Sequence, residues 1–429
     1  MSAAADETQQ STADCMASMG RAARYATGAL AGADAATRNR IIRRTAELIR
    51  ERREQILEDN AADKAQAQAS GRRGAMLDRL SLDEARIDAM AAGLDAVAML
   101  DDPLGQIDKR WERPNGLCIE RITVPLGVIG IVYESRPNVT VDAGVLCVKS
   151  GNAVILRGGS ECVRSNRQLH TCLADALEQN GLPRTAVQFV PTQDREAVGL
   201  LLAGLNGNVD VLVPRGGRSL VERVHNDARV PVIGHLDGIC HVYLHGDCST
   251  KMAIDIAVNA KMRRTGICGA AETVLVDSAC AERVLPALGK ALEAAGCSVR
   301  GDTTTQRLVS SASTATEQDW TTEYLDAIVA IRVVEDFAAA VSHIATYGSG
   351  HTDAIVTNDQ TAADAFLRQV DSAIVLHNAS TQFADGGEFG MGAEIGIATG
   401  RIHARGPVGA NELTSYKYCV RGSGQTRPN

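Results

Sequence analysis

The sequence has 429 residues, which corresponds to about three domains at roughly 150 residues each. Its 44 basic and 52 acidic residues give a net charge of −8, and 3% of its residues are aromatic, so its composition argues against nucleic acid or an anionic membrane as the main partner. Hydrophobic residues make up 45%, which is ordinary for a soluble globular protein, and the longest apolar stretch, residues 124–133, is about half as long as a membrane-spanning helix requires.

The N-terminal residues 1–15 are polar and acidic, and they lack the basic and apolar regions of a secretory signal. We therefore predict a disordered tail there. The eleven cysteines form no C-x-x-C pair, and several lie inside apolar runs. This usage favours buried, reduced thiols in a cytoplasmic protein over a disulfide framework.

Two kinds of element are expected before residue 125. Over residues 17–101, apolar residues recur at spacings of three and four, which predicts a series of amphipathic helices. Over residues 110–123, the turn signal Pro114-Asn115-Gly116 lies between two short extended runs and predicts a hairpin that could serve subunit contact.

Short apolar runs then alternate with helical stretches as far as residue 234. The predicted strands are nearly continuous in their apolar character, which is typical of a parallel sheet covered on both faces. This alternation predicts a doubly wound α/β domain, and a similar series over residues 241–377 predicts a second one. The expected strands of the two series are residues 128–133, 153–156, 187–190, 209–213 and 230–234, then 241–245, 273–277, 328–334, 354–357 and 373–377.

Two turns rich in glycine follow predicted strands. One strand ends in Pro214-Arg215-Gly216-Gly217 before a helix, and Arg157 is followed by two glycines in the same way. Glycines and a helix N-terminus suit a phosphate group, although a pair of glycines after a strand is more often an ordinary turn. Neither segment matches a P-loop or the G-x-G-x-x-G pattern.

Cys268 follows a basic stretch and is flanked by glycines, a context that suits a thiolate nucleophile and a small core residue about equally. Asn138 lies at a strand-to-helix corner, where it could stabilise an oxyanion or cap the helix. His235, His241 and His245 match no common zinc spacing, so we expect no metal site.

Five segments carry a resemblance to a known family. Together they show that the sequence, from about residue 17 to residue 422, resembles the γ-glutamyl phosphate reductases, a family within the aldehyde dehydrogenase superfamily. The segments are residues 124–143 (VPLGVIGIVYESRPNVTVDA), 149–161 (KSGNAVILRGGSE), 213–224 (VPRGGRSLVERV), 342–357 (SHIATYGSGHTDAIVT) and 385–418 (DGGEFGMGAEIGIATGRIHARGPVGANELTSYKY).

The resemblance implies an aldehyde dehydrogenase-like fold of two doubly wound α/β domains and a small β oligomerisation element. The cofactor-binding domain would comprise residues 1–109 and 125–234, and the catalytic domain, which carries Cys268, would comprise residues 235–378. Residues 379–400 would return to the cofactor-binding domain. Residues 110–124 and 401–429 would form the oligomerisation element.

The implied activity is the NADPH-dependent reduction of L-γ-glutamyl 5-phosphate to L-glutamate 5-semialdehyde, with phosphate release through a cysteine thioester. This is the second step of proline biosynthesis from glutamate. The implied partners are a small acyl phosphate and further copies of the chain in a homo-oligomer, and a contact with glutamate 5-kinase is a further suggestion. No nucleic acid and no membrane are expected.

Matched motif by motif, the resemblance implies that Cys268 is the nucleophile. It also implies that the Asn138 amide and the Cys268 backbone N–H stabilise the oxyanion. The residues implied for the cofactor are Arg157, Arg215, Gly216, Gly217 and Glu323, of which Glu323 aligns with a carboxylate that holds the nicotinamide ribose in hydrolytic relatives. The candidates for the substrate's carboxylate or phosphate are Arg264, His351 and Arg405.

Two departures from the superfamily pattern bear on the chemistry. His235 stands where hydrolytic relatives carry a general-base glutamate, which favours phosphate over water as the acyl partner. Gly269 stands where asparagine is more usual. The alternatives are a hydrolytic NAD(P)-dependent aldehyde dehydrogenase, an ATP-using kinase or transferase, and a non-catalytic protein that has kept the fold.

Overall fold

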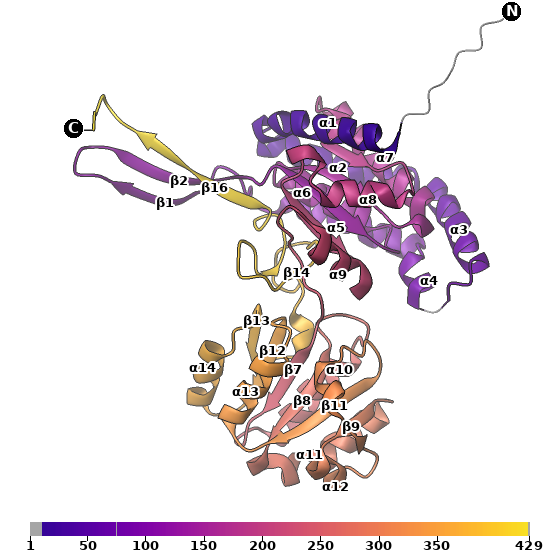
Figure 1. The fold of residues 1–429 in the computed structure, drawn as a ribbon, viewed down its shortest axis with the longest axis vertical. Coiled ribbons are helices and arrows are strands. Elements are labelled where there is room, and N and C mark those ends of the chain that lie inside the picture. The colour runs from indigo at the N-terminus through magenta and orange to yellow at the C-terminus, as the bar shows by residue number, and fades with distance from the viewer. Residues whose placement is uncertain (1–10, 74, 428–429) are drawn as a thin grey trace, which may run out of the picture. The chain divides into compact units, whose positions relative to one another are not determined.

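The computed structural model describes residues 11–73 and 75–427, and the chain divides into two compact units (Figure 1). Unit 1 comprises Met1–Gly234, Met391–Gly396 and Val408–Asn429. Unit 2 comprises His235–Gly390 and Ile397–Pro407.

The predicted N-terminal helices are confirmed and belong to unit 1. Side chains of Ser11, Asp34 and Asp83 accept backbone N–H bonds at three helix starts, which satisfies donors that have no partner within the helix. The predicted disordered tail is too long at its C-terminal end because α1 already begins at Thr12, and residues 1–10 lie outside the described residues. The helices are α1 (Thr12–Gly32), α2 (Ala35–Glu51), α3 (Arg53–Ala69), α4 (Ala75–Leu80) and α5 (Glu84–Met99).

The core of unit 1 is a parallel four-stranded sheet with the order β5-β4-β3-β6. Every residue of the central strand β3 is buried, as expected for a strand covered on both faces. The strands are β3 (Val128–Tyr133), β4 (Ala153–Arg157), β5 (Val187–Phe189) and β6 (Val211–Arg215), and the helices between and after them are α6 (Val139–Lys149), α7 (Val163–Gln179), α8 (Arg195–Leu202) and α9 (Arg218–Asp227).

The predicted hairpin is present and is joined by a third strand from the C-terminus. The strands β1 (Ile107–Glu112), β2 (Cys118–Pro125) and β16 (Thr414–Arg421) form an antiparallel sheet in the order β1-β2-β16. Several large apolar side chains on this sheet are exposed, namely Ile107, Trp111, Tyr416, Tyr418 and Val420.

Unit 2 contains a parallel sheet of seven strands in the order β10-β9-β11-β8-β7-β12-β13. One apolar cluster joins its strands to α10 and α11, and a second joins them to α13 and α14, so both faces are covered. The short elements β9, α12 and β10 have no counterpart among the predicted ones. The elements are β7 (Cys240–Leu244), α10 (Thr250–Met262), β8 (Ala271–Asp277), α11 (Ser278–Ala294), β9 (Ser298–Gly301), α12 (Thr303–Leu308), β10 (Ser313–Thr314), β11 (Ile328–Val334), α13 (Phe337–Tyr347), β12 (Thr352–Val356), α14 (Gln360–Gln369) and β13 (Ile374–His377).

The glycine-rich segment after β13 divides differently from the prediction. Only Met391–Gly396 of the predicted return segment 379–400 joins unit 1. Gln382 instead donates to the Ala260 carbonyl at the end of α10, and Arg401 and Arg405 both pair with Asp371 of unit 2. Two short strands, β14 (Ile397–Ala398) and β15 (Gly406–Pro407), pair in an antiparallel arrangement in this part of unit 2.

No helix among residues 11–73 and 75–427 is both long and apolar enough to cross a membrane.

A buried ion pair lies between α10 and β8. Lys261 and Glu272 are both fully buried, and the Lys261 ammonium also lies over the Tyr324 ring at 5.7 Å from its centroid. Burial raises the pKa of Glu272 to about 7, even though Lys261 acts in the opposite direction. Each charge therefore depends on the other, because removing one leaves its partner without compensation in a dry interior.

We expect Lys261→Met to lower the free energy of unfolding by about 3–5 kcal/mol at pH above about 8, as measured by chemical denaturation. The loss should be smaller near about pH 6, because the unpaired Glu272 can then take up a proton and become neutral. Lys290→Met, which changes an exposed lysine of α11, is the control and should shift the free energy by less than about 0.5 kcal/mol. An equal loss in both variants would contradict this interpretation.

Candidate active site

Three residues that could carry chemistry lie just before neighbouring strands of unit 2. His235 precedes β7, Cys268 precedes β8, and His351 directly precedes β12, and the sheet order places β7 between β8 and β12. Because these strands are parallel, their amino ends share one edge of the sheet. The topology therefore gathers at one place residues that are far apart in the sequence.

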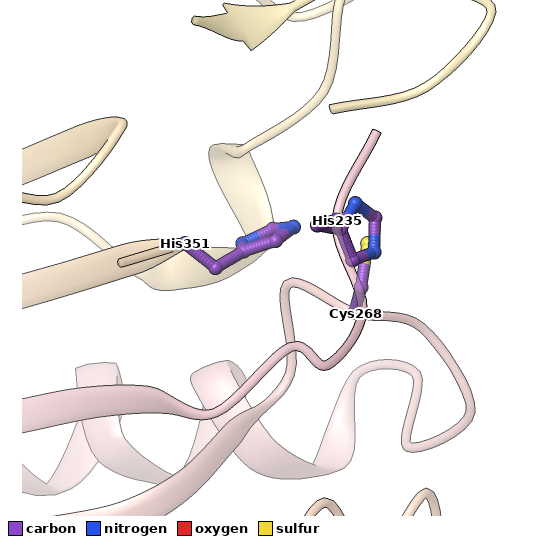
Figure 2. Close-up of side chains that lie close together, drawn as sticks. All are labelled: His235, Cys268 and His351. Carbon is purple, nitrogen blue, oxygen red and sulfur yellow. The ribbon is translucent and has the colours of Figure 1, made fainter. Parts of the chain in front are cut away.

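Figure 2 shows the side chains of these residues converging. One ligand-type atom of each, two ring nitrogens and the Cys268 sulfur, lie within 4.8 Å of one another. The His235 and His351 rings meet edge to face, with centroids 4.7 Å apart. His351 is fully buried, whereas Cys268 and His235 are partly exposed.

The loop that carries Cys268 is held by a close backbone approach at Gly238. A Cβ at position 238 would lie 2.4 Å from the Cys268 carbonyl oxygen and 2.7 Å from its Cα, which no side chain can accommodate. The thiol of Cys240 donates to the same carbonyl at 3.0 Å, and burial keeps the pKa of Cys240 well above its usual value, so this donor keeps its proton. These contacts fix the backbone of Cys268 from two sides.

Glu323 lies close to this loop. Its carboxylate accepts the backbone N–H of Gly238 at 3.0 Å, on the residue that packs against Cys268. Sterically, position 269 favours glycine, because a Cβ there would lie 3.1 Å from the Thr381 carbonyl oxygen. A longer side chain at position 269 would have to displace the segment around Thr381.

Two candidate cofactor residues of unit 1, Arg157 and Arg215, lie at the carboxyl ends of the strands of its sheet. Arg157 ends β4 and Arg215 ends β6, and both strands pair with β3, where their partners are the adjacent residues Val132 and Tyr133. The two guanidinium groups therefore lie at the carboxyl edge of the sheet, where open α/β sheets bind ligands. Within the described part of the chain, Nε of each arginine is buried and has no hydrogen-bond partner. Such donors suit the oxygens of a phosphate.

The Gly216-Gly217 turn has a protein carboxylate beside it. Glu134 accepts the backbone N–H of Gly217 at 2.9 Å, and a Cβ at position 216 would lie 2.6 Å from the same carboxylate oxygen. The N-terminus of α9 is thus already neutralised by an acidic group. A dinucleotide pyrophosphate at this turn would have to displace Glu134 or bind beside it.

Asn138 does not cap helix α6 through its side chain in the described structure. Its Nδ2 instead donates to Asp142 Oδ2 at 2.7 Å, one helical turn further along. Burial raises the pKa of Asp142 to about 6, while the Asn138 bond and the Arg215 charge act against that rise. The bond fixes which way the amide faces and leaves the second Nδ2 hydrogen for another acceptor.

The candidate substrate residues fall into different environments. His351 is part of the cluster around Cys268, and Arg264 is exposed on the loop that carries that cysteine. The guanidinium of Arg405, in contrast, donates to a carboxylate oxygen of Asp371 at 2.6 Å and also to its backbone carbonyl. An anionic substrate at Arg405 would have to compete with that carboxylate.

The fold and the cysteine loop define the class of protein. The family model described as "Aldehyde dehydrogenase family" matches residues 2–326, so the chain is a member of that family of oxidoreductases. A glyceraldehyde-3-phosphate dehydrogenase from Methanocaldococcus jannaschii, solved with NADP, shares the fold with a TM-score of 0.68 at 14% identity, and covers 96% of this chain and 95% of its own. The predicted aldehyde dehydrogenase-like α/β fold is thereby confirmed.

Closer relatives narrow the assignment within this class. Gamma-glutamyl phosphate reductase of Caulobacter vibrioides is 56% identical over 96% of this chain and 100% of its own length. The structure of gamma-glutamyl phosphate reductase from Thermotoga maritima has a TM-score of 0.94 and 41% identity, over 97% of this chain and 100% of that one. The chain belongs to the γ-glutamyl phosphate reductase family, as the motifs predicted.

Sequence reasoning missed several contacts of these residues. Cys240, Asp142 and Glu134 were assigned no role at the site, although each bonds directly to a candidate residue or its turn. A signal existed only for Asp142, whose spacing of four from Asn138 predicts a contact on a helix. The contact of Cys240 with the Cys268 loop follows from strand pairing, which a single sequence does not reveal.

Replacing Gly238 by alanine should displace the Cys268 loop, because the new Cβ would overlap backbone atoms that cannot rotate away. We expect turnover to fall by about 100-fold, the scale associated with a misplacement of about 1 Å. Steady-state kinetics with the acyl phosphate would measure this loss. Gly400→Ala is the control, because a Cβ there meets nothing within 4 Å, and unchanged turnover in Gly238→Ala would refute the role of this contact.

Proposed function

We propose that this chain reduces γ-glutamyl phosphate to glutamate 5-semialdehyde with NADPH and releases phosphate, which is a step of proline biosynthesis. Membership of the γ-glutamyl phosphate reductase family supports the substrate. The observation that carries the chemistry is the partly exposed Cys268 on a braced loop beside two histidines. A thiol so placed can act as a nucleophile once it is ionised.

The covalent route has two stages on the same sulfur. The Cys268 thiolate attacks the acyl carbon, the carbon–sulfur bond forms, and the carbon–oxygen bond to phosphate breaks, so that phosphate leaves with the bonding electron pair. NADPH, when bound, supplies the hydride that converts the thioester into a thiohemiacetal. Collapse of that species releases the aldehyde and restores the Cys268 thiolate.

Asn138 is proposed to stabilise the negative oxygen that develops during these stages. Its amide is already oriented by the bond to Asp142, so little reorganisation is needed when the oxygen acquires charge. The backbone N–H of Cys268 is proposed as the second donor. Asp142 acts through Asn138 and is therefore a positioning residue.

Arg157 and Arg215 are proposed to hold the phosphates of the cofactor. Their buried, unpartnered Nε atoms within the described structure, and their shared place at the carboxyl edge of the sheet, support this assignment. Gly216 and Gly217 are proposed to lie near the pyrophosphate and Glu323 near the nicotinamide ribose. NADPH carries one phosphate more than NADH, and two arginines at this edge suit that additional negative charge.

His235 supports phosphate rather than water as the acyl partner. One ring nitrogen, Nδ1, is engaged by the Ile397 carbonyl at 2.6 Å, and no glutamate stands at this position of the sequence to activate water. Arg264, His351 and Arg405 are proposed as the groups that meet the substrate's anionic ends. In this arrangement the thioester persists until hydride reaches it.

The enzyme is proposed to work in the cytoplasm as a homo-oligomer, with a catalytic domain formed by residues 235–378. None of the eleven cysteines, all of which lie among the described residues, forms a disulfide, which suits a reducing compartment. The exposed apolar side chains of the β1-β2-β16 sheet support subunit contact through it. A contact with glutamate 5-kinase would protect the unstable acyl phosphate and is proposed on that chemical ground.

Cys268→Ser should abolish turnover while NADPH binding, followed by fluorescence titration, is retained. In the reverse direction, NADP⁺ reduction by glutamate 5-semialdehyde should require phosphate in the unmodified enzyme, because phosphate must release the acyl group. Cys15→Ser removes another partly exposed thiol and serves as the control. Full activity of Cys268→Ser would refute the covalent route, and aldehyde oxidation without phosphate would indicate the hydrolytic alternative.

Asn138→Ala should reduce kcat by about 10²–10³, the cost of removing one oxyanion donor, with little change in the affinity for NADPH. Asn226→Ala, at an exposed position of α9, is the matched control and should leave kcat unchanged. Stopped-flow measurement of acyl-enzyme formation would locate the effect in the first chemical stage. A loss confined to cofactor affinity would show that Asn138 has a different role.

A further inference from the structure

We propose that His235, Cys268 and His351 form a binding site for one thiophilic divalent cation, with Zn²⁺ as the favoured occupant. The site is built from two imidazoles and one thiol whose ligand atoms lie within 4.8 Å of one another. The sequence spacing of these residues matches no common zinc pattern. The cluster exists only because three parallel strands begin side by side.

The donor set selects the class of cation. Nitrogen and sulfur ligands with no carboxylate among them suit Zn²⁺ and disfavour Mg²⁺ and Ca²⁺, which prefer oxygen. Zinc–ligand bonds of about 2.0–2.3 Å place tetrahedral ligands roughly 3.5 Å apart. The three side chains therefore need to close by roughly 1 Å, which small rotations of the side chains can supply.

Both histidines are already oriented for metal binding. Nδ1 of His235 bonds to the Ile397 carbonyl at 2.6 Å, which fixes the ring, so Nε2 is the nitrogen that would bind the cation. Nδ1 of His351 lies 2.9 Å from the Thr352 hydroxyl. In metal sites, the ring nitrogen of a ligating histidine that does not bind the metal usually makes a hydrogen bond of this kind.

His351 provides an independent indication of a ligand. Its side chain is fully buried, and its Nε2 has no hydrogen-bond partner within the described part of the chain. In Figure 2 the His351 ring points toward His235 and Cys268. A buried nitrogen without a partner carries a desolvation cost, which a bound cation would offset.

Binding of Zn²⁺ would form a bond to the Cys268 sulfur and release the thiol proton to solvent. The three protein ligands would leave a fourth position open to water or to an anion. A sulfur bound in this way cannot attack an acyl carbon. Zn²⁺ should therefore be a reversible inhibitor that competes with the acyl phosphate, and this consequence rests on the proposed function of Cys268.

The test uses Co²⁺ as a spectroscopic probe on the full chain. Tetrahedral Co²⁺ bound to a thiolate absorbs in the visible range and has a sulfur-to-metal charge-transfer band in the near ultraviolet. We expect one equivalent of Co²⁺ per chain to produce both signals and Zn²⁺ to displace it. Cys268→Ser should lose the charge-transfer band, and His235→Gln should weaken Zn²⁺ binding by at least the 10- to 100-fold that loss of a ligand's supporting partner causes.

Two controls keep the outcome decisive. Cys15→Ser and His245→Gln remove a thiol and an imidazole outside the cluster and should bind Co²⁺ like the unmodified chain. Absence of the signals in the unmodified chain, or a charge-transfer band that survives in Cys268→Ser, would overturn the proposal. Because the titration requires no turnover, Co²⁺ binding without inhibition would support the site and contradict only the catalytic role of Cys268.

Discussion

The close approach of two backbone segments at Gly238 and Cys268 is the constraint on which the cysteine loop depends. No Cβ fits between them, and the Cys240 thiol donates to the same carbonyl that Gly238 faces. The carboxylate of Glu323 holds Gly238 from its other side. A cysteine on a loop would ordinarily move with that loop, but here the strand that begins at Cys240 helps to fix the Cys268 backbone. Precise placement of a nucleophile is worth several kcal/mol in a reaction barrier, so under the proposed role of Cys268 this packing also serves the chemistry.

The two sheets present their chemistry at opposite ends. In unit 1 the candidate cofactor residues lie at the carboxyl edge, as is usual for open α/β sheets, with Arg157 and Arg215 on strands that flank β3. In unit 2 the cluster around Cys268 lies before the strands, at the amino edge. The parallel arrangement is what makes each edge chemically distinct, because every strand of a sheet contributes the same end.

Polar side chains near these sites are held by partners that the chemistry would have to displace or use. Asp142 orients Asn138, whereas Glu134 at the α9 N-terminus and Asp371 on Arg405 already satisfy groups proposed to bind anions. These carboxylates reduce the cost of leaving charged groups uncompensated in the free protein. A cofactor or substrate must bind these groups more strongly than the carboxylates do, which is a physical source of selectivity.

Much of this protein was readable from its sequence, because the periodicity of apolar residues and the turn signals are local properties. The helices, most strands of both sheets and the hairpin followed in this way, and the basic stretch and glycines around Cys268 are equally local. The short elements β9, α12 and β10 carry too few residues to show a period. The partners of Cys268 were decided by the tertiary structure alone. His235, Cys240 and His351 reach it through the order of β7, β8 and β12 in the sheet, and that order depends on pairing between distant segments, which no local pattern encodes.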